Sequence, residues 1–449
     1  MRIRFWGTRG SIARPGPRTL RYGGNTSCVE VEADDGTLVV LDCGTGAYEL
    51  ALDLRRRGPL PAIGNLLIGH AHWDHIQGFP LFEPLYDPPS EWRIHAPGDR
   101  IDHLQQTFAR QMSPEHHPIA LGDLKASVSF RVLTEGSFPV GGIRVSAQYL
   151  HHPALTLGYR LEADGASLVY ATDHEPHAVP LHGGASPLAG RDDGLAPVHP
   201  EDRRHASFLA GADLVIHDAQ YTLAEYAERR GWGHTPMECA VDYAIAAAAK
   251  RLALFHHDPD RDDAAVDLLV ASARERVAKS GAALEVFAAA EGNELELRAA
   301  WLDSPPLHLP SGSALLEPAA LSARTVLLAE DDPEVARRLA AVLRGDGLRL
   351  VHVTELGAAL DAARLAPPSL LLLDLAVPRT ELLAACRQLR GAADPRLREI
   401  PVLLVAGSAP TEREVREAFE AGATDYLARP VKATLLRSRI RGWLMRAQP

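Results

Sequence analysis

The chain has 449 residues, which is more than one ordinary hydrophobic core organises, and this length predicts two or three domains. Hydrophobic residues make up 46% of it and charged residues 23%, a composition that indicates a globular protein and excludes a disordered one. The formal net charge of −11 argues against nonspecific nucleic-acid binding, because phosphate binding favours a basic surface; RNA remains open only as a substrate.

Apolar runs and cysteines indicate the compartment. The longest apolar run, 370–377, is far shorter than the roughly 20 residues that cross a bilayer, and the first residues lack the apolar region of a secretory signal. We therefore expect a cytoplasmic protein with no membrane partner. No C-x-x-C pair occurs, so reduced and mostly buried thiols are expected at Cys28, Cys43, Cys239 and Cys386.

The first two thirds of the chain contain many short apolar stretches that predict strands and few helical patterns. This pattern favours two packed sheets covered outside by helices, an α/β class. The polar stretch 176–205 is expected to be a long loop. Strands are predicted at 3–7, 28–33, 37–44, 65–71, 92–97, 128–133, 143–150, 156–163, 167–173 and 213–219, and helices at about 46–57, 101–111, 236–250 and 262–279.

A Pro- and Ser-rich stretch at 303–323 predicts a linker that separates domains at 1–302 and 324–449. Beyond it, apolar strands alternate regularly with helical patterns, which predicts a doubly wound (βα)5 parallel sheet. The strands are expected at 325–330, 348–353, 369–375, 401–407 and 424–428, and the helices at 333–344, 356–365, 380–390, 411–421 and 431–446.

The most distinctive motif is HAHWDH at 70–75, directly after an apolar run. In an extended segment residues i and i+2 point the same way, so His70 and His72 can face one ion. Asp74 and His75 would follow at a turn, where residues 76–85 would begin a helix. Imidazole and carboxylate donors without thiolate suit zinc, manganese or iron. Surface histidines that merely coincide are the alternative, which so dense a cluster makes improbable.

Two ions need more donors than this motif contains. Further histidines and aspartates follow later apolar strands immediately, where a layered α/β fold gathers its site residues. They are His151 and His152, Asp173 and His174, and His256 and His257.

HAHWDH resembles the signature of the metallo-β-lactamase fold, and the later elements resemble its phosphodiesterase branch, which includes ribonuclease Z and cyclic-nucleotide phosphodiesterases. The resemblance covers about residues 1–300 and implies an αββα sandwich with two divalent ions. Between neighbours, His152 fits the family better than His151, and His256 better than His257, although both choices stay open. The implied ligands are His70, His72 and His152 for one ion, Asp74, His75 and His256 for the other, and Asp173 as a bridge.

The sequence GWGHTP at 231–236 resembles the His-Ser/Thr element that ribonuclease Z-like enzymes place shortly before the last ligand; His234 precedes His256 by 22 residues. A loop histidine before a helix with Thr235 as N-cap and Pro236 as first residue is an alternative, and both can hold. The resemblance implies hydrolysis by a hydroxide that two divalent ions generate. Asp74 would orient it and accept its proton, and His234 would protonate the departing oxygen.

For other polar features the sequence supports weaker predictions. The glycine-rich stretches 7–11, 21–27 and 42–47 either shape the pocket or form tight turns between strands. Nothing matches the flexible arm with which ribonuclease Z holds the tRNA body, which disfavours tRNA processing. Five histidines in or beside the polar loop are expected to be solvated: His174, His177, His182, His199 and His205.

Residues 324–446 resemble a response-regulator receiver domain. The resemblance implies a Mg²⁺ site formed by Glu330, Asp331 and Asp374, with Asp374 as phospho-acceptor and a histidine kinase or other phosphodonor as partner. Two positions depart from the family: Ala406 stands where a hydroxyl residue normally contacts the phosphoryl group, and Arg429 stands where a lysine does. Arg429 can still pair with phosphate and Tyr426 is the expected switch residue, whereas Ala406 offers no hydrogen bond. Phosphorylation and a degenerate docking or dimerisation role therefore both stay open.

Together these features predict a dinuclear metal-dependent phosphodiesterase, with zinc favoured over manganese or iron, fused to a receiver-like domain. Whether this receiver regulates catalysis stays open. A small phosphodiester, above all a cyclic nucleotide, is the expected substrate, and a homodimer is expected. Three alternatives remain: hydrolysis of another bond such as a thioester or lactam, an RNA-processing nuclease, and a two-component signalling adaptor that acts by docking.

Overall fold

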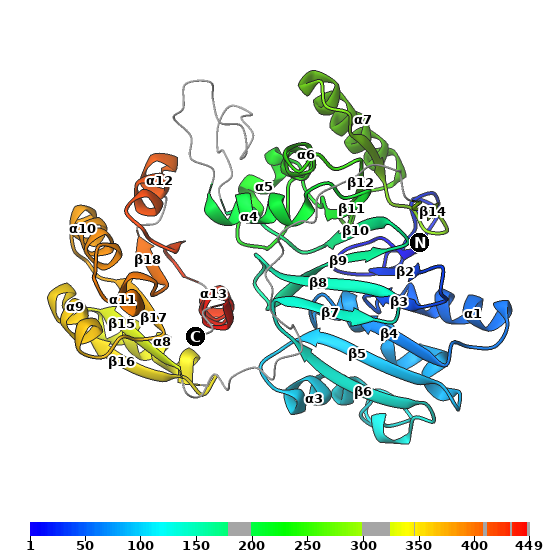
Figure 1. Cartoon of the computed structure of the whole chain (residues 1–449), viewed down its shortest axis with the longest axis horizontal. Helices are drawn as coiled ribbons and strands as arrows, with labels where there is room; N and C mark the ends of the chain where they lie inside the picture. Colours follow the sequence, from blue (N-terminus) through cyan, green and yellow to red (C-terminus); the bar gives the residue numbers. More distant parts are fainter. Residues whose placement is uncertain (178–198, 299–323, 345, 407–410, 432, 447–449) are drawn as a thin grey trace. The chain divides into compact units, whose positions relative to one another are not determined.

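The computed structural model describes residues 1–177, 199–298, 324–344, 346–406, 411–431 and 433–446 (Figure 1). The chain forms two compact units. The first contains the described residues 1–177 and 200–298, and the second contains His199 and the described residues from 324 onward. The predicted linker at 303–323 lies outside the described residues.

The first unit contains two seven-stranded sheets. In the first sheet the strand order is β14-β1-β2-β3-β4-β5-β6, with antiparallel pairing from β14 to β3 and parallel pairing from β3 to β6. The bounds are β1 (Arg2–Gly7), β2 (Cys28–Glu32), β3 (Leu38–Leu41), β4 (Ile63–Leu67), β5 (Glu91–Pro97), β6 (Ser127–Leu133) and β14 (Glu294–Glu296).

The second sheet has the order β13-β12-β11-β10-β9-β8-β7, antiparallel from β7 to β10 and parallel from β10 to β13. The two sheets pack face to face: the hydroxyl of Tyr159 donates to the carbonyl of Ile68 at 2.7 Å. The bounds are β7 (Gly136–Val140), β8 (Ile143–Leu150), β9 (Thr156–Ala163), β10 (Ala166–Ala171), β11 (Leu214–Asp218), β12 (Arg251–Phe255) and β13 (Glu285–Ala288).

Helices cover both outer faces of this sandwich (Figure 1). On the first sheet, α1 (Ala47–Arg57) and α3 (Ile101–Gln111) bury apolar side chains in one cluster with Leu66 and Ile94. On the second sheet, a cluster around Val215 and Leu252 includes side chains of α4 (Pro200–Leu209), α5 (Leu223–Arg229), α6 (Met237–Ala246) and α7 (Asp263–Ser280). The expected αββα sandwich is therefore confirmed.

Two local predictions were wrong. The helix after the histidine motif is one turn long, α2 (Trp73–Ile76), and it contains Asp74 and His75. Because Pro80 and Pro84 cannot donate backbone hydrogen bonds, the chain continues as the 3-10 turns η1 (Phe79–Leu81) and η2 (Glu83–Tyr86), followed later by η3 (Leu121–Asp123). Helix α4 begins at Pro200, inside the stretch that was expected to be a loop.

The second unit is a five-stranded parallel sheet with the order β16-β15-β17-β18-β19, as the alternation of elements predicted. Its strands are β15 (Thr325–Glu330), β16 (Arg349–Val353), β17 (Leu370–Asp374), β18 (Val402–Ala406) and β19 (Asp425–Ala428). Its helices are α8 (Pro333–Arg344), α9 (Leu356–Leu365), α10 (Arg379–Arg390), α11 (Pro395–Arg398), α12 (Glu412–Glu420) and α13 (Ala433–Arg446).

Two predictions from composition can be compared with these elements. None of the helices in the described ranges is both long enough and apolar enough to span a bilayer. All four cysteines are free and buried, as expected. Burial raises the pKa of the Cys28 and Cys239 thiols well above the usual range, so both are held as thiols.

Candidate metal centre

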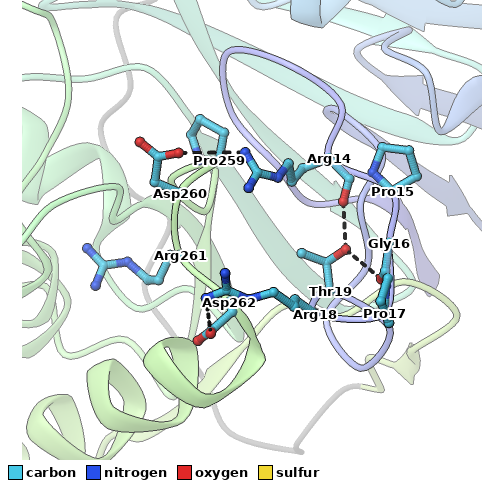
Figure 2. A pocket seen from close by; sticks show the side chains of 10 residues that line it. All are labelled: Arg14, Pro15, Gly16, Pro17, Arg18, Thr19, Pro259, Asp260, Arg261 and Asp262. Atoms are coloured by element: carbon cyan, nitrogen blue, oxygen red, sulfur yellow. Dashed lines mark hydrogen bonds and ion pairs between the residues drawn. The ribbon is translucent and has the colours of Figure 1, made fainter.

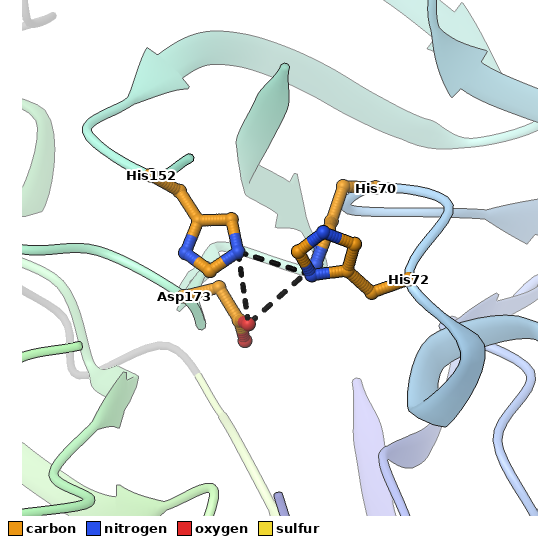
Figure 3. Close-up of side chains that lie close together, drawn as sticks. All are labelled: His70, His72, His152 and Asp173. Carbon is orange, nitrogen blue, oxygen red and sulfur yellow. Dashed lines mark hydrogen bonds and ion pairs between the residues drawn. The ribbon is translucent and has the colours of Figure 1, made fainter. Parts of the chain in front are cut away.

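One group of donors gathers around the first histidines of the motif. His70 follows β4, and His72 caps α2 with extended backbone angles, so the two rings lie on one side, as i and i+2 spacing predicted. His152, which follows β8, brings its Nε2 atom to 3.2 Å from Nδ1 of His72. Figure 3 shows these three imidazoles facing Asp173; one donor atom of each of the four lies within 4.8 Å of the others.

A second group lies beside the first. The Nε2 atoms of His75 and His256 lie 3.3 and 3.2 Å from Oδ2 of Asp74, and the three residues form a separate buried group with donor atoms within 4.8 Å of one another. The backbone N–H of Ser11 donates to the same Asp74 oxygen at 2.7 Å. The β1–β2 loop therefore holds this carboxylate in place.

Asp173 lies between the two groups. Its Oδ2 atom is 3.6 Å from Nε2 of His70 and 3.7 Å from Nε2 of His152. Its Oδ1 atom is 3.3 Å from Nε2 of His75 and 3.2 Å from Nε2 of His256. One carboxylate thus turns one oxygen toward each group, which is the arrangement expected of a bridging ligand.

Three strand ends aim side chains into the centre through strained backbone. Asp42, Asp173 and His256 follow β3, β10 and β12 and have φ values of 60°, 59° and 58°. This left-handed conformation is unfavourable for residues other than glycine and is typically retained at functional sites. The energetic cost indicates that the direction of these side chains matters more than local stability.

The hydrogen bonds of the imidazoles test whether the centre fits metal ions. The Nδ1 atoms of His75, His152 and His256 contact Asp42 Oδ2 at 2.7 Å, the Gly233 carbonyl at 2.9 Å and Gln220 Oε1 at 3.2 Å. An acceptor at Nδ1 fixes the proton there and leaves the Nε2 lone pair pointing inward, as in metal-binding histidines.

His70 gives a further indication. Both of its ring nitrogens are buried without a hydrogen-bond partner among the described residues, although such burial normally costs free energy. Burial lowers the pKa of His70 well below the usual range and that of His152 to about 3, so both rings are neutral. Neutral imidazole is the form that binds metal, and the donor set fits divalent ions.

The neighbouring histidines that the sequence left open point elsewhere. The His151 ring stacks on His177 at 3.9 Å between centroids, and its Nδ1 atom contacts the carbonyl of Glu175. Nε2 of His257 contacts the carbonyl of Ala289 at 2.9 Å. The structure therefore brings His152 and His256 to the centre, and their role as ligands stays a prediction.

His234 lies beside both groups of donors. Its ring stacks on His256 at 5.0 Å, and its Nδ1 atom is 3.0 Å from Asp218 Oδ2 and 4.0 Å from Asp173 Oδ2. Burial alone lowers the pKa of His234, but the Asp218 carboxylate outweighs it and raises this pKa to about 9. Helix α6 begins at Met237 with Pro236 as N-cap, so the expectation for Thr235 was wrong.

Sequence reasoning missed two carboxylates that support the site. Asp42 accepts hydrogen bonds from the Tyr170 hydroxyl at 2.6 Å and the Gly69 N–H at 2.7 Å while it contacts His75. Asp218 accepts from the Thr235 N–H at 3.2 Å while it contacts His234. Both follow or end apolar strands, the signal that located Asp173, but we interpreted 42–47 as a glycine-rich loop.

The solvated state expected for the loop histidines was wrong for several of them. His174 and His205 are only 2% and 1% exposed, and their rings stack at 3.8 Å. The Nε2 atom of His205 lies 2.8 Å from Nε2 of His217. They are buried because helix α4, which sequence patterns did not predict, covers this part of the second sheet. His182 lies outside the described residues.

A cavity of about 170 Å³ lies between the β1–β2 loop and the segment after His257 (Figure 2). It contains none of the predicted ligands. Its arginines are paired with acids: Arg14 lies 3.6 Å from Asp260, and Arg18 lies 2.6 Å from Asp262. The cavity therefore presents balanced charge and no converging donors for a metal ion.

The second unit places its predicted acids at the carboxyl edge of its sheet. Glu330 and Asp374 are neighbours in the register of β15 and β17, and Asp331 follows Glu330. Arg429 donates from Nε to Asp374 Oδ1 at 2.9 Å, and its Nη2 contacts the same oxygen. Tyr426 is half-buried against the core of this unit. The side chain of Ala406 lies outside the described part.

Comparison with known proteins assigns both units. Residues 37–187 match the model of the beta-lactamase superfamily domain, and residues 326–441 match the response regulator receiver domain. The chain combines these two domains. The match of the first to a beta-lactamase superfamily domain implies a hydrolase fold with divalent metal ions, in agreement with the donors described above.

Individual relatives match one domain each. Ribonuclease Z of Haloarcula marismortui is 26% identical over 61% of this chain and 91% of its own length. The DNA-binding response regulator MtrA of Mycolicibacterium smegmatis is 34% identical over 27% of this chain, which spans only 50% of that regulator. The metallo-beta-lactamase fold protein YhfI from Bacillus subtilis has a TM-score of 0.45 and 17% identity, over 66% of this chain and 98% of that one.

Proposed function

We propose that the beta-lactamase superfamily domain is a dinuclear metal-dependent phosphodiesterase that hydrolyses a small cyclic phosphodiester such as a cyclic nucleotide. The observation that carries this proposal is the position of Asp173, whose two carboxylate oxygens face two separate groups of histidine nitrogens at 3.2–3.7 Å. A single ion cannot use both groups, whereas two ions bridged by one carboxylate can.

The proposed ligands are those that the sequence predicted. His70, His72 and His152 would hold one ion, Asp74, His75 and His256 the other, and Asp173 would bridge them. Zinc fits this nitrogen- and oxygen-rich set best, with manganese or iron as alternatives. Two such ions, when bound, supply a nucleophilic hydroxide at neutral pH and neutralise charge on the phosphoryl oxygens.

The residues of the chain perform the proton transfers. Asp74 keeps a fixed orientation because Ser11 donates to its Oδ2 atom, so it can orient the nucleophile and accept its proton. His234 is held at Nδ1 by Asp218, which leaves Nε2 to donate a proton to the departing oxygen. The Asp218 carboxylate raises the pKa of His234, which favours the protonated ring that this donation needs.

A second candidate substrate is RNA, because the relative from Haloarcula marismortui is a ribonuclease Z. The same chemistry cleaves RNA phosphodiesters. The net charge of −11 argues against an RNA substrate, because a negatively charged protein repels a long polyanion.

The receiver domain is proposed to respond to a phosphodonor such as a histidine kinase. Asp374 would accept the phosphoryl group and Glu330, Asp331 and Asp374 would hold Mg²⁺. The ion pair between Arg429 and Asp374 competes with both events, so docking or homodimerisation without phosphorylation is the alternative.

The proposal is tested by metal analysis together with turnover of bis(p-nitrophenyl) phosphate, 2′,3′- and 3′,5′-cyclic nucleotides, a precursor tRNA and a thioester. We expect two equivalents of metal and fastest turnover of a cyclic nucleotide. Asp374→Ala serves as a matched acidic control and should leave basal turnover unchanged. Absence of bound metal and of turnover would overturn the proposal, whereas selective cleavage of precursor tRNA would favour the RNA candidate.

A further inference from the structure

The loop 231–235, which carries His234, is attached to the second sheet by a buried carboxylate. Glu175 follows β10 and is only 4% exposed. The backbone N–H groups of Gly231 and Gly233 donate to its Oε1 and Oε2 atoms at 2.7 and 2.9 Å. Because the loop forms neither helix nor strand, the carboxylate satisfies N–H groups that would otherwise need backbone partners.

The backbone conformation of the loop suits a bound anion. Gly231 and Gly233 have φ values of 80° and 92°, a left-handed conformation that other residues rarely adopt. Backbone N–H groups that converge in such a turn form a concavity that favours negative charge. Here the chain itself supplies the anion, because Glu175 occupies this position and also accepts from the hydroxyl of Tyr226 on α5.

Both segments that Glu175 joins reach the proposed metal centre. Glu175 itself follows the proposed bridging ligand Asp173 by two residues. In the loop, the Gly233 carbonyl lies 2.9 Å from Nδ1 of His152, and the next residue is His234. A Cβ atom on Gly233 would lie 2.2 Å from the same Nδ1 atom, so the loop and this ring are in close contact. The position of the loop therefore affects both a proposed ligand and the proposed proton donor.

We propose that Glu175 is a positioning residue, whose carboxylate holds the loop 231–235 so that His234 and the Gly233 carbonyl reach the metal centre. This inference rests on the proposed phosphodiesterase function and adds a residue to it. A carboxylate has two acceptor oxygens, so it serves both N–H groups, whereas an isosteric glutamine turns an NH₂ group toward one of them. The loop then shifts, and a displacement of about 1 Å can lower a rate by about 100-fold.

Turnover of two substrates at saturating zinc tests whether Glu175 acts through the loop. Glu175→Gln should lower kcat for adenosine 2′,3′-cyclic phosphate about tenfold more than kcat for bis(p-nitrophenyl) phosphate, because only the first leaving group needs a proton. Competition with a fluorescent chelator should show about tenfold weaker zinc binding, because His152 loses the support of the Gly233 carbonyl. Equal losses of kcat on both substrates would overturn the proposal, since general destabilisation does not depend on the leaving group.

Asp202→Asn is the matched control. Asp202 is a buried carboxylate on α4 that likewise accepts from a tyrosine hydroxyl, that of Tyr243 at 2.7 Å, and from a backbone N–H, that of His177 at 3.0 Å. Its loss should lower thermal stability, as that of Glu175 does, but should leave the ratio of the two kcat values and the zinc affinity unchanged. A ratio that changes equally in both variants would contradict a specific role of Glu175.

Amide hydrogen exchange of the full-length protein separates this inference from the proposed function, because it requires neither bound metal nor turnover. Peptides that cover residues 229–236 should exchange several-fold faster in Glu175→Gln than in wild type, and at the wild-type rate in Asp202→Asn. If no phosphodiester is turned over but exchange rises as expected, the phosphodiesterase proposal fails and the attachment of the loop by Glu175 stands. Unchanged exchange in Glu175→Gln would overturn the attachment.

A milder variant covers the case in which Glu175→Gln does not fold. Tyr226→Phe removes only the hydroxyl that donates to Glu175 and leaves the carboxylate in place. It should change the kcat ratio and the exchange of residues 229–236 in the same direction by a smaller factor. If Tyr226→Phe folds and changes neither quantity, the proposal is wrong.

Discussion

Asp173 and Asp374 occupy similar positions in two different sheets, just after or at the carboxyl end of an apolar strand, β10 and β17. Around Asp173 lie histidine nitrogens whose lone pairs face inward, so the site needs an external cation. Around Asp374 lies Arg429, a cation that the chain itself provides. Similar positions at a strand end therefore give one site whose donors suit a metal ion and another site whose aspartate is already paired with an arginine.

The groups near Asp173 and the groups near Asp374 also differ in their ionisation. Near Asp173, burial keeps His70 and His152 neutral and suited to metal. Near Asp374, burial and the second carboxylate raise the pKa of Glu330 to about 7, because two adjacent acids cannot both ionise easily. The first site offers a group of donors that suits metal ions, whereas at the second site Mg²⁺ would have to displace Arg429.

The largest expected effect comes from the residue that joins the two groups. Asp173→Ala should remove bound metal and reduce turnover by more than about 100-fold, the upper range for residues that only support ligands. Metal content by mass spectrometry and turnover of bis(p-nitrophenyl) phosphate measure this. The same change at Asp374 should affect neither quantity. Retention of both metals in Asp173→Ala would contradict the bridging role.

The next effect concerns the leaving group. His234→Ala should lower turnover of a cyclic nucleotide by about 10²–10⁴, the range for a general acid, with metal content unchanged. Turnover of bis(p-nitrophenyl) phosphate should fall much less, since p-nitrophenolate needs no proton to depart. Asp218→Asn should show the same substrate dependence in weaker form. Equal losses on both substrates would exclude proton donation by His234.

A smaller effect is expected at the carboxylate that orients His75. Asp42→Asn should weaken metal affinity by about 10–100-fold, because the amide supports the His75 tautomer less well. Tyr170→Phe, which removes only the hydroxyl that donates to Asp42, should have a milder effect in the same direction. Competition with a fluorescent zinc chelator gives both affinities, and an unchanged affinity in Asp42→Asn would rule out this support.

In the receiver, Arg429→Lys should make Asp374 accept phosphate from acetyl phosphate several-fold faster. A lysine ammonium makes a single, more flexible contact than the two guanidinium N–H groups that hold Asp374 Oδ1. Phosphate-affinity gel electrophoresis measures labelling, and Asp374→Ala provides the unlabelled control. If wild type is labelled as fast as Arg429→Lys, the arginine does not block the site.

The smallest expected effect is a difference between the two domains in how much folding stability each loses at acidic pH. Burial lowers the pKa of His205 and His217, so below about pH 6.5 the unfolded chain binds protons that the folded chain does not. Stability from their neutral burial is therefore present above that pH and lost as pH falls. The loss grows as the pH falls further below this value.

Differential scanning calorimetry at several pH values checks this expectation. The transition of the metal-free hydrolase domain should move to lower temperature between pH 7.5 and 5.5 more than that of the receiver, whose sequence contains only His352. His205→Gln should reduce the pH dependence of the first transition. A pH dependence that this variant leaves unchanged would contradict the assignment.

The sequence predicted most of the metal centre because its signals are local. HAHWDH places four donors within six residues, and His152, Asp173 and His256 each follow an apolar strand. Asp218 and Gln220 were missed because their importance depends on contacts with His234 and His256, which are distant in sequence. The end of an apolar strand marks Asp218 as a candidate, but this signal does not reveal which side chain Asp218 contacts.

The sequence by itself determined the two domains, the strand-end positions of the predicted ligands and the replacement of lysine by Arg429. Periodicity and local motifs carry this information, because burial repeats along each element. Only the tertiary structure decided which of two neighbouring histidines faces the centre and which carboxylates orient the rings. These properties depend on side-chain direction and on contacts between segments that only the packed sheets and helices bring together.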